Sequence, residues 1–277
     1  MPFLNKSFFL LSFLFLFTPS NIFGQKKEVM IIAHRGGVVN EKLSENSFGA
    51  LEEAISRGYT HVEVDVRMSK DGKLVCFHND RINALSENSG RISKLTWNEI
   101  QSFKLEGSKE PIPSFEEYVE RCKNRIGLML DIKGCDQKDV EHYSNQIMQI
   151  LEEHEMLTES LILINKLPMN NQEKIAEYFM GKCKVSWRKG LDKTIKEVTD
   201  DGEFSENYYY FNHASDFSKK TVDSLHSKGV KVIVSVNTQH YITNGIKQGK
   251  KDISKLLKWG VDGFQIDSVY DEELVKN

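Results

Sequence analysis

The sequence predicts an α/β fold in the form of a single (β/α)8 barrel (TIM barrel). Short apolar or β-branched runs alternate with amphipathic stretches, a pattern typical of a parallel sheet that is covered by helices. The alternation extends over about 250 residues, a length that suits one barrel. The open, doubly wound sheet is the alternative, but Arg35-Gly36-Gly37 after the first expected strand does not match the Gly-rich phosphate loop of that fold.

The expected strands follow one another at intervals that leave room for most of the covering helices. They are residues 29–33, 61–66, 74–77, 127–132, 161–164, 184–186, 208–211, 230–236 and 263–266. A barrel has eight places for these nine runs, and 184–186 is our candidate for a peripheral strand. The link between residues 66 and 74 is too short for a covering helix, so we expect an irregular connection there.

Amphipathic stretches between these runs predict helices at 44–57, 114–122, 138–154, 171–179, 216–227 and 252–259. The first helix is expected to open on a Ser/Asn cap and to end before Gly58. The stretch from Lys247 to Lys258 carries five Lys and one Asp, and we interpret it as the solvated face of a helix.

Residues 1–24 are expected to be a signal peptide, and residues 25–277 a single domain. Lys6 is the only charged residue in this leader, which continues with an apolar run and ends at Gly24. The run is shorter than the about 20 residues that a membrane helix needs, which disfavours an uncleaved anchor. We therefore expect an exported protein, periplasmic or secreted, whose mature chain has no stable membrane span.

The charge balance bears on the class of partner. The chain carries 37 Lys+Arg and 40 Asp+Glu, a formal net charge of −3. This balance offers no extended basic surface, so nucleic acid is not an expected partner. A small-molecule substrate is expected instead, and the sequence does not predict an oligomeric state.

Chemically active residues gather where the first four expected strands end. His34 and Arg35 follow the first strand, and His78 follows the third. Glu63 and Asp65 lie in the second, while Asp131 ends the fourth and is followed by Lys133. Barrel enzymes build their active sites at the carboxyl ends of the strands, so these side chains are expected to share one rim.

The acidic residues predict a metal site. Glu63 and Asp65 are two residues apart in a strand and therefore face the same side, while valines occupy the alternate positions. If that side is the barrel interior, the two anions repel each other unless a divalent cation binds them. With Asp131 they form an all-oxygen set that favours Mg²⁺ or Ca²⁺. The alternative is that both acids lie on the solvated face of an edge strand.

The two histidines and two cations fit phosphodiester chemistry. Cleavage needs a base for the attacking oxygen and an acid for the leaving oxygen, and His34 and His78 suit both tasks near neutral pH. Arg35 and Lys133 would neutralise the phosphate oxygens. A lone histidine at a strand end is usually structural, whereas two beside three acids favour catalysis.

Nine short segments occur in the order found in glycerophosphodiester phosphodiesterases, and they span nearly all of residues 25–277. They are His34-Arg35-Gly36, Ser44-Glu45-Asn46-Ser47, Glu63-Val64-Asp65-Val66, Lys70-Asp71-Gly72, His78-Asn79-Asp80, Pro113-Ser114-Phe115-Glu116-Glu117, Asp131-Ile132-Lys133, Val236-Asn237 and Gly260-Val261-Asp262-Gly263. The chain therefore resembles the glycerophosphodiester phosphodiesterase family.

This resemblance implies a TIM barrel of the phospholipase C-like phosphodiesterase type. It also implies metal-dependent hydrolysis of glycerophosphodiesters to glycerol 3-phosphate and an alcohol. The matching site residues are the acid–base pair His34 and His78, the metal ligands Glu63, Asp65 and Asp131, the phosphate contacts Arg35 and Lys133, and the supporting acid Glu45. We expect Glu45 to orient Arg35.

Four positions depart from the family pattern. Ser44 replaces a usual Pro, and Ser also starts a helix well. Asn79 stands where Asp commonly follows the histidine, and Asp131 replaces a common Glu. Val234 stands where the family often has Trp, which we expect to remove an aromatic wall from the pocket and which bears on the substrate.

Two other functions stay open at this point. One is a related barrel phosphodiesterase that acts on phospholipids or envelope polymers, which would need an apolar rim. The other is a non-catalytic barrel that binds phosphorylated ligands, against which the pair of histidines argues.

Overall fold

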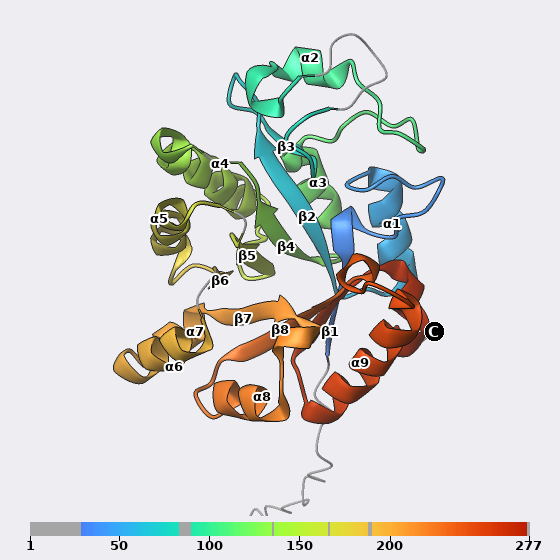
Figure 1. The fold of residues 1–277 in the computed structure, drawn as a ribbon. Helices are drawn as coiled ribbons and strands as arrows, with labels where there is room; N and C mark the ends of the chain where they lie inside the picture. The colour runs from blue at the N-terminus through green and yellow to red at the C-terminus, as the bar shows by residue number, and fades with distance from the viewer. Residues whose placement is uncertain (1–28, 83–89, 135, 166, 188–189, 276–277) are drawn as a thin grey trace, which may run out of the picture.

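Eight parallel strands surround a central axis in the computed structural model, and helices cover them on the outside (Figure 1). The model describes residues 29–82, 90–134, 136–165, 167–187 and 190–275. The strands in ring order are β6 (Lys184–Ser186), β5 (Ser160–Leu163), β4 (Gly127–Ile132), β2 (His61–Met68), β1 (Met30–Ala33), β9 (Gly263–Ile266), β8 (Lys231–Val236) and β7 (Tyr209–His213). A parallel bridge between Val185 and Tyr208 links the two ends, so the predicted barrel is confirmed as a nearly closed ring.

The surplus strand is β3 (Leu74–Cys76), and our choice of 184–186 as peripheral was wrong. β3 pairs antiparallel with the end of β2, opposite Val66–Met68, and has no place in the ring. A parallel partner needs a crossover of a dozen or more residues, and the link after Met68 is far shorter. The irregular connection that we expected is therefore a hairpin, and it carries the chain back toward the barrel mouth.

Among the described residues, the outer layer consists mainly of seven helices with apolar inner faces. They are α1 (Phe48–Arg57), α3 (Phe115–Cys122), α4 (Val140–Glu153), α5 (Met169–Phe179), α6 (Leu191–Asp200), α8 (Lys219–His226) and α9 (Gly245–Trp259). The shorter helices are α2 (Trp97–Gln101), α7 (Phe204–Asn207) and α10 (Asp271–Leu274).

The start of α1 differs from the prediction. Ser47 is the N-cap, and its side chain accepts a hydrogen bond from the Ala50 amide. Ser44 instead donates to the carbonyl of Glu106 and accepts from the amide of Ser108 at 3.1 Å. The helix ends as expected, with Gly58 in the left-handed conformation.

Three apolar clusters stabilise the fold. The largest fills the layer between the strands and the helices and includes Val62, Val64 and Val66 of β2. A smaller cluster lies inside the barrel, below the mouth, and includes Met129, Leu161 and Ile233. The third is a satellite core beneath the segment between β3 and α3; its buried members are Val75, Ile82, Ile92, Ile100, Phe103, Leu105 and Ile112.

The proposed leader, residues 1–24, lies outside the described residues, so the signal peptide stays a prediction. Within the described part of the chain, no helix has the length and apolar character needed to cross a membrane.

Candidate active site

The loop after β1 adopts a backbone shape that only its two glycines permit. Arg35 is left-handed (φ 55°), and Gly36 and Gly37 follow with φ of 79° and 132°. A Cβ atom on Gly36 would lie 2.4 Å from Cα of Asn46, and one on Gly37 would lie 2.1 Å from the carbonyl oxygen of Ala50. This close approach brings the start of α1 to the barrel mouth.

The same loop holds the acids in place. The backbone amide of Arg35 donates to Oε2 of Glu63 at 2.7 Å. The side chain of Asn46 donates to Oδ2 of Asp65 at 2.9 Å and accepts from the amide of Asp65 at 3.0 Å. Asn46 is fully buried, so this bidentate contact fixes Asp65 rigidly.

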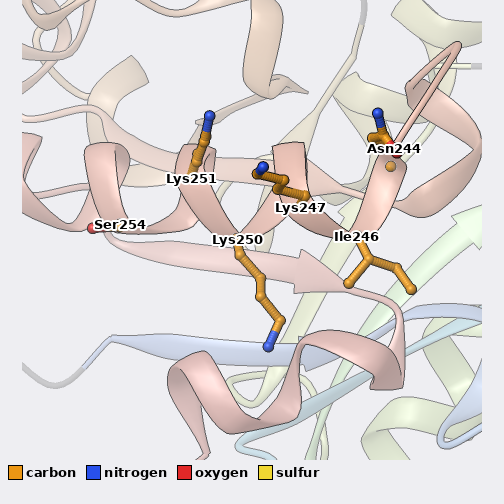
Figure 2. Close-up of a pocket in the computed structure, with 7 residues that line it drawn as sticks. Asn244, Ile246, Lys247, Lys250, Lys251 and Ser254 are labelled. Carbon is orange, nitrogen blue, oxygen red and sulfur yellow. The ribbon is translucent and has the colours of Figure 1, made fainter.

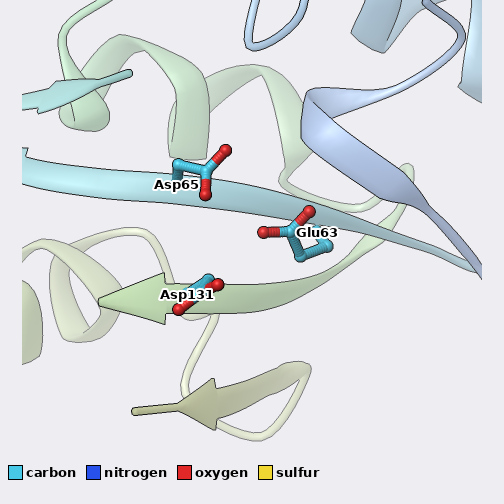
Figure 3. A group of neighbouring side chains, drawn as sticks. All are labelled: Glu63, Asp65 and Asp131. Atoms are coloured by element: carbon cyan, nitrogen blue, oxygen red, sulfur yellow. The ribbon is translucent and has the colours of Figure 1, made fainter. Parts of the chain in front are cut away.

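The three predicted acids converge inside the mouth (Figure 3). Asp65 of β2 and Asp131 of β4 are register partners on adjacent strands, and Glu63 lies two residues deeper on β2. Each offers a carboxylate oxygen within 4.8 Å of the others, and all three side chains are buried. The alternative of a solvated edge strand is therefore wrong, because β2 lies in the middle of the sheet.

Lys133 shares this buried space. Its ammonium lies 3.0 Å from Oδ1 of Asp65 and donates to Oδ2 of Asp131. Burial alone would lower the pKa of Lys133, but the three carboxylates outweigh it and hold that pKa above its usual value. One ammonium against three carboxylates leaves a formal charge of −2.

The negative charge of the neighbouring acids affects the pKa of Glu63. Burial first, and then the charges of Asp65 and Asp131, raise this pKa well above its usual value. Burial opposes ionisation of Asp65 as well, yet the charges of Lys133 and His78 keep its pKa below the usual value. A divalent cation among these oxygens would match the charge of −2, and hard oxygen donors suit Mg²⁺ or Ca²⁺. The buried triad is therefore compatible with a divalent metal site.

His34 has a carboxylate partner that sequence reasoning missed. Its Nδ1 lies 2.7 Å from Oδ1 of Asp267, whose Oδ2 accepts hydrogen bonds from the amide and the hydroxyl of Thr238, each at 2.7 Å. Burial would raise the pKa of Asp267, but the bond and charge of His34 and the two Thr238 bonds lower it to about 2. Asp267 directly follows β9, so the strand-end rule that selected the other residues would have found it.

His78 reaches the mouth by a route that was not predicted. β3 runs antiparallel to β2, and the amide of Phe77 donates to the carbonyl of Asp65 at 2.9 Å. The next residue, His78, therefore lies level with the acids. Arg67 holds it there by donating Nε and Nη2 to the His78 carbonyl at 3.1 and 2.7 Å. Nδ1 of His78 lies 3.2 Å from Oδ1 of Asn79, which supplies the acceptor position of the usual Asp.

Arg35 points across the mouth between two partners. Nη1 donates to Oε2 of Glu45 at 2.8 Å, and Nη2 donates to Oε1 of Gln239 at 3.4 Å. The contact expected between Glu45 and Arg35 is present, while a part for Glu45 in binding stays a prediction. Nε of Arg35 is buried and has no hydrogen-bond partner among the described residues.

One cavity of about 870 Å³ contains seven of the eight predicted site residues. Its charged half consists of His34, Arg35, Glu63, Asp65, His78, Asp131 and Lys133, with Glu45 behind Arg35. The opposite half includes Trp187, Tyr208, Tyr210, Phe211, Asn212 and His213.

Val234 does not belong to this cavity. It is fully buried in the layer between strands and helices, and its neighbour Ser235 faces the cavity instead. The expectation that Val234 removes an aromatic wall is therefore wrong, and Trp187 and Phe211 supply aromatic rings on the opposite half. The fold and this cavity define a barrel enzyme equipped to bind an anionic substrate and to move protons beside it.

The comparisons with known proteins agree with this class. The model of the glycerophosphoryl diester phosphodiesterase family matches residues 34–270. Because that match spans most of the sequence, the chain belongs to the glycerophosphoryl diester phosphodiesterase family, and it is an enzyme of the phosphoric diester hydrolase class.

Similar curated proteins include the putative glycerophosphodiester phosphodiesterase YhdW of Bacillus subtilis, 24% identical over 89% of this chain and 97% of that protein. Glycerophosphodiester phosphodiesterase 1 of Homo sapiens is 27% identical over 53% of this chain and 48% of that protein.

Similar solved structures include a glycerophosphoryl diester phosphodiesterase from Parabacteroides distasonis. It has a TM-score of 0.71 and 19% identity, with 90% of this chain and 87% of that chain covered. A phosphodiesterase from Oleispira antarctica, solved with the product sn-glycerol-3-phosphate, has a TM-score of 0.67 and 22% identity, with 86% and 92% covered. These likenesses show the fold.

Proposed function

We propose that the protein hydrolyses glycerophosphodiesters to glycerol 3-phosphate and an alcohol, with a divalent cation and two histidines. The observation that carries the proposal is the buried acid triad with its residual charge of −2, in one cavity with His34 and His78. The name of the matching family and the product bound to the Oleispira antarctica protein support the choice of substrate.

Glu63, Asp65 and Asp131 would hold one Mg²⁺ or Ca²⁺ ion. When bound, this ion would supply positive charge to a non-bridging phosphate oxygen in the transition state. Arg35 and Lys133 would bind the remaining phosphate oxygens, Arg35 through the Nε–H that lacks a protein partner. Lys133 already lies between Asp65 and Asp131, so it is placed to bind the same phosphate beside the ion.

The hydrogen bonds of His34 favour its role as the base. The Asp267 carboxylate accepts a hydrogen bond from Nδ1–H of His34. The proton of the neutral imidazole therefore lies on Nδ1, and Nε2 carries the lone pair. The side-chain nitrogen of Asn237, a donor, lies 3.4 Å from Nε2 and is consistent with this tautomer. Nε2 would take the proton of the attacking hydroxyl, and His78 would protonate the leaving alcohol.

Two routes lead to the same products. Water attacks phosphorus directly, or the neighbouring glycerol hydroxyl attacks first and forms a cyclic phosphate that water then opens. A cyclic phosphate detected early in a single turnover would support the second route. His34 and His78 have the same proton-transfer tasks in the ring-forming step of that route.

The decisive experiment is a metal-reconstituted assay on a panel of phosphodiesters, run beside His34→Ala and His78→Ala. We expect release of glycerol 3-phosphate from soluble diesters such as glycerophosphocholine, loss of turnover on chelation, and strong impairment of both variants. Full activity in both variants would refute the mechanism. Turnover of detergent-dispersed phospholipid alone would favour the related phosphodiesterase that acts on lipids.

We also propose, from the leader sequence, that the protein is exported and is periplasmic or secreted. The N-terminus of protein recovered from cells that express the full chain tests this proposal, and a start near Gln25 is the expected result. If Met1 were still present both in the exported protein and in the cell-bound protein, the proposal would be contradicted.

A further inference from the structure

Exposed aliphatic side chains gather at one side of the barrel mouth. Among the residues that the structure describes, six large hydrophobic side chains are exposed, and four of them lie on the segments that follow β1, β8 and β9, with Ile246 in the first turn of α9. These are Val39 (37% exposed), Ile242 (102%), Ile246 (49%) and Val269 (39%), which we call the rim patch. Single exposed hydrophobic residues are ordinary, whereas a cluster on one edge marks an interaction surface.

Hydrogen bonds link the three segments that carry the rim patch. The hydroxyl of Ser268 donates to the carbonyl of Val39 at 3.5 Å, and the hydroxyl of Tyr270 donates to the carbonyl of Gly245 at 3.0 Å. Val39 and Val269 line one small cavity together with His34. The rim patch therefore adjoins the active site and does not lie on a remote face.

Helix α9 adds positive charge beside the rim patch. The helix contains five lysines and a single acid, Asp252, so it is positively charged although the whole chain has a net charge of −3. A shallow groove of about 750 Å³ runs along its first turns; the lining residues are Asn244, Gly245, Ile246, Lys247, Lys250, Lys251 and Ser254 (Figure 2).

The lysines of this groove are not equivalent. Lys250 forms ion pairs with Glu273 at 3.1 Å and Glu272 at 3.5 Å. Lys251 points away from the side of the helix that carries Lys250 and Ile246 (Figure 2), and no acidic side chain in the described part of the chain lies within ion-pair distance of Lys247 or Lys251. The ammonium groups of Lys247 and Lys251, which line the same groove as Ile246, are thus available to an external anion.

We propose that the rim patch, with Lys247 and Lys251, docks onto an anionic lipid surface and brings the barrel mouth beside it. Aliphatic side chains enter the boundary between headgroups and acyl chains, while neighbouring ammonium groups bind lipid phosphates. Exposed isoleucine and unpaired lysine together match a lipid surface, which has apolar acyl chains beneath anionic headgroups. The inference goes beyond the proposed function, because docking needs no turnover.

A tryptophan placed in the rim patch tests the docking directly. Ile246→Trp should show a blue-shifted emission with vesicles of phosphatidylcholine and phosphatidylglycerol, together with quenching by brominated lipid. The matched control is Leu257→Trp, because Leu257 is exposed on the same helix but lies near its other end. No shift at position 246, or an equal shift at both positions, would overturn the proposal.

Sedimentation with the same vesicles separates the two parts of the surface. The double variant Ile242→Asp/Ile246→Asp should bind at least tenfold more weakly, on the order expected when two aliphatic side chains are lost from the interface. Lys247→Gln/Lys251→Gln should lose roughly fivefold per charge, and vesicles without phosphatidylglycerol should bind weakly. Leu257→Asp should bind as the parent does. Residues 1–24 contain a long apolar run, so all variants are compared as full chains with the same N-terminus.

One outcome points to a different partner. Vesicle binding that survives the isoleucine changes but is lost with the lysine changes would indicate a purely electrostatic contact with a polyanion or an acidic protein. That result would overturn docking by insertion. Thermal unfolding of every variant, followed by circular dichroism, shows that the compared proteins are folded.

Discussion

Asp65 and Asp131 face each other as register partners on adjacent parallel strands, and the Lys133 ammonium lies between them. Two carboxylates at that spacing repel each other, and a single ammonium cannot offset the additional charge of Glu63. With all three acids ionised the cluster would carry a net negative charge, which is why the pKa of Glu63 is raised, and a divalent cation is the complement that we propose.

Asp65→Asn should lose metal and rate together. The change removes one anion from the triad and leaves the shape of the side chain nearly intact. We expect metal affinity to fall by at least roughly the 10–100-fold that disturbance of a ligand shell costs. Metal content after dialysis and turnover at saturating metal measure both effects. The control is Asp200→Asn, because Asp200 is exposed on α6. Normal metal content in Asp65→Asn would count against the ligand assignment.

Asp267→Asn should lower kcat with little change in KM. The asparagine side chain has no charged oxygen to accept the hydrogen bond from Nδ1–H. The imidazole of His34 therefore loses the carboxylate that fixes its tautomer. We expect a loss of about 10²-fold or more, the range of a positioned proton-transfer group.

Thr238→Val is the matched control for this position. It removes one of the two Thr238 bonds to Asp267 but leaves the contact with His34, so its effect should be small. Equal losses in Thr238→Val and Asp267→Asn would show that the whole loop, and not the carboxylate, determines the rate.

Glu45→Gln should raise KM by about fivefold and leave kcat nearly unchanged. The ion pair with Arg35 is partly exposed, so its contribution is on the order of 1 kcal/mol. Without this ion pair, the Arg35 side chain adopts other rotamers. Its binding to the substrate in the ground state and in the transition state is then weakened to a similar extent. Gln239→Ala is the comparison, because its 3.4 Å contact with Arg35 is longer and should matter less. A large fall in kcat for Glu45→Gln would instead indicate a direct part in the reaction.

His61 should make the protein sensitive to mild acid. Burial, assisted by the charge of Lys231, lowers the pKa of His61 from the ordinary value of 6.5 to about 4. Below pH 6.5 the unfolded chain binds a proton at this position while the folded chain resists it. The stability from neutral His61 is therefore fully present above pH 6.5 and is lost as the pH falls to about 4.

The size of this effect is up to about 3 kcal/mol. Chemical denaturation at a series of pH values measures it in the parent and in His61→Gln, which cannot titrate. The variant should show a flatter dependence of the unfolding free energy between pH 6.5 and 4. Parallel curves for the two proteins would contradict the assignment to His61.

Much of the barrel and the acid site follows from local patterns. The valines at 62, 64 and 66 set which face of β2 is buried against helices, and the acids at 63 and 65 must then face inward. That argument uses only the two-residue period of a strand. It needs no knowledge of distant parts of the chain, which explains why it succeeds.

The errors arise where long-range contacts decide. The three residues of β6 look too few for a barrel strand, but pairing with β5 and the bridge to Tyr208 secure their place in the ring. Ser44 looks like a helix cap until the loop at Glu106 binds its hydroxyl. Asp267 lies 233 residues after His34 in the sequence, and only the parallel pairing of β9 with β1 makes it the partner of His34.

The hairpin of β2 and β3 divides the proposed chemistry between the ring of parallel strands and a strand that lies outside the ring. The acids and His34 belong to the barrel itself, whereas His78 is delivered by a strand whose Val75 is anchored in the satellite core. Loosening that small core would displace one imidazole while the cation pocket stayed assembled. Under the proposed mechanism, such a protein would still bind the cation and the phosphate, yet it would protonate the leaving alcohol slowly, so a change in this appendage would affect turnover more than binding.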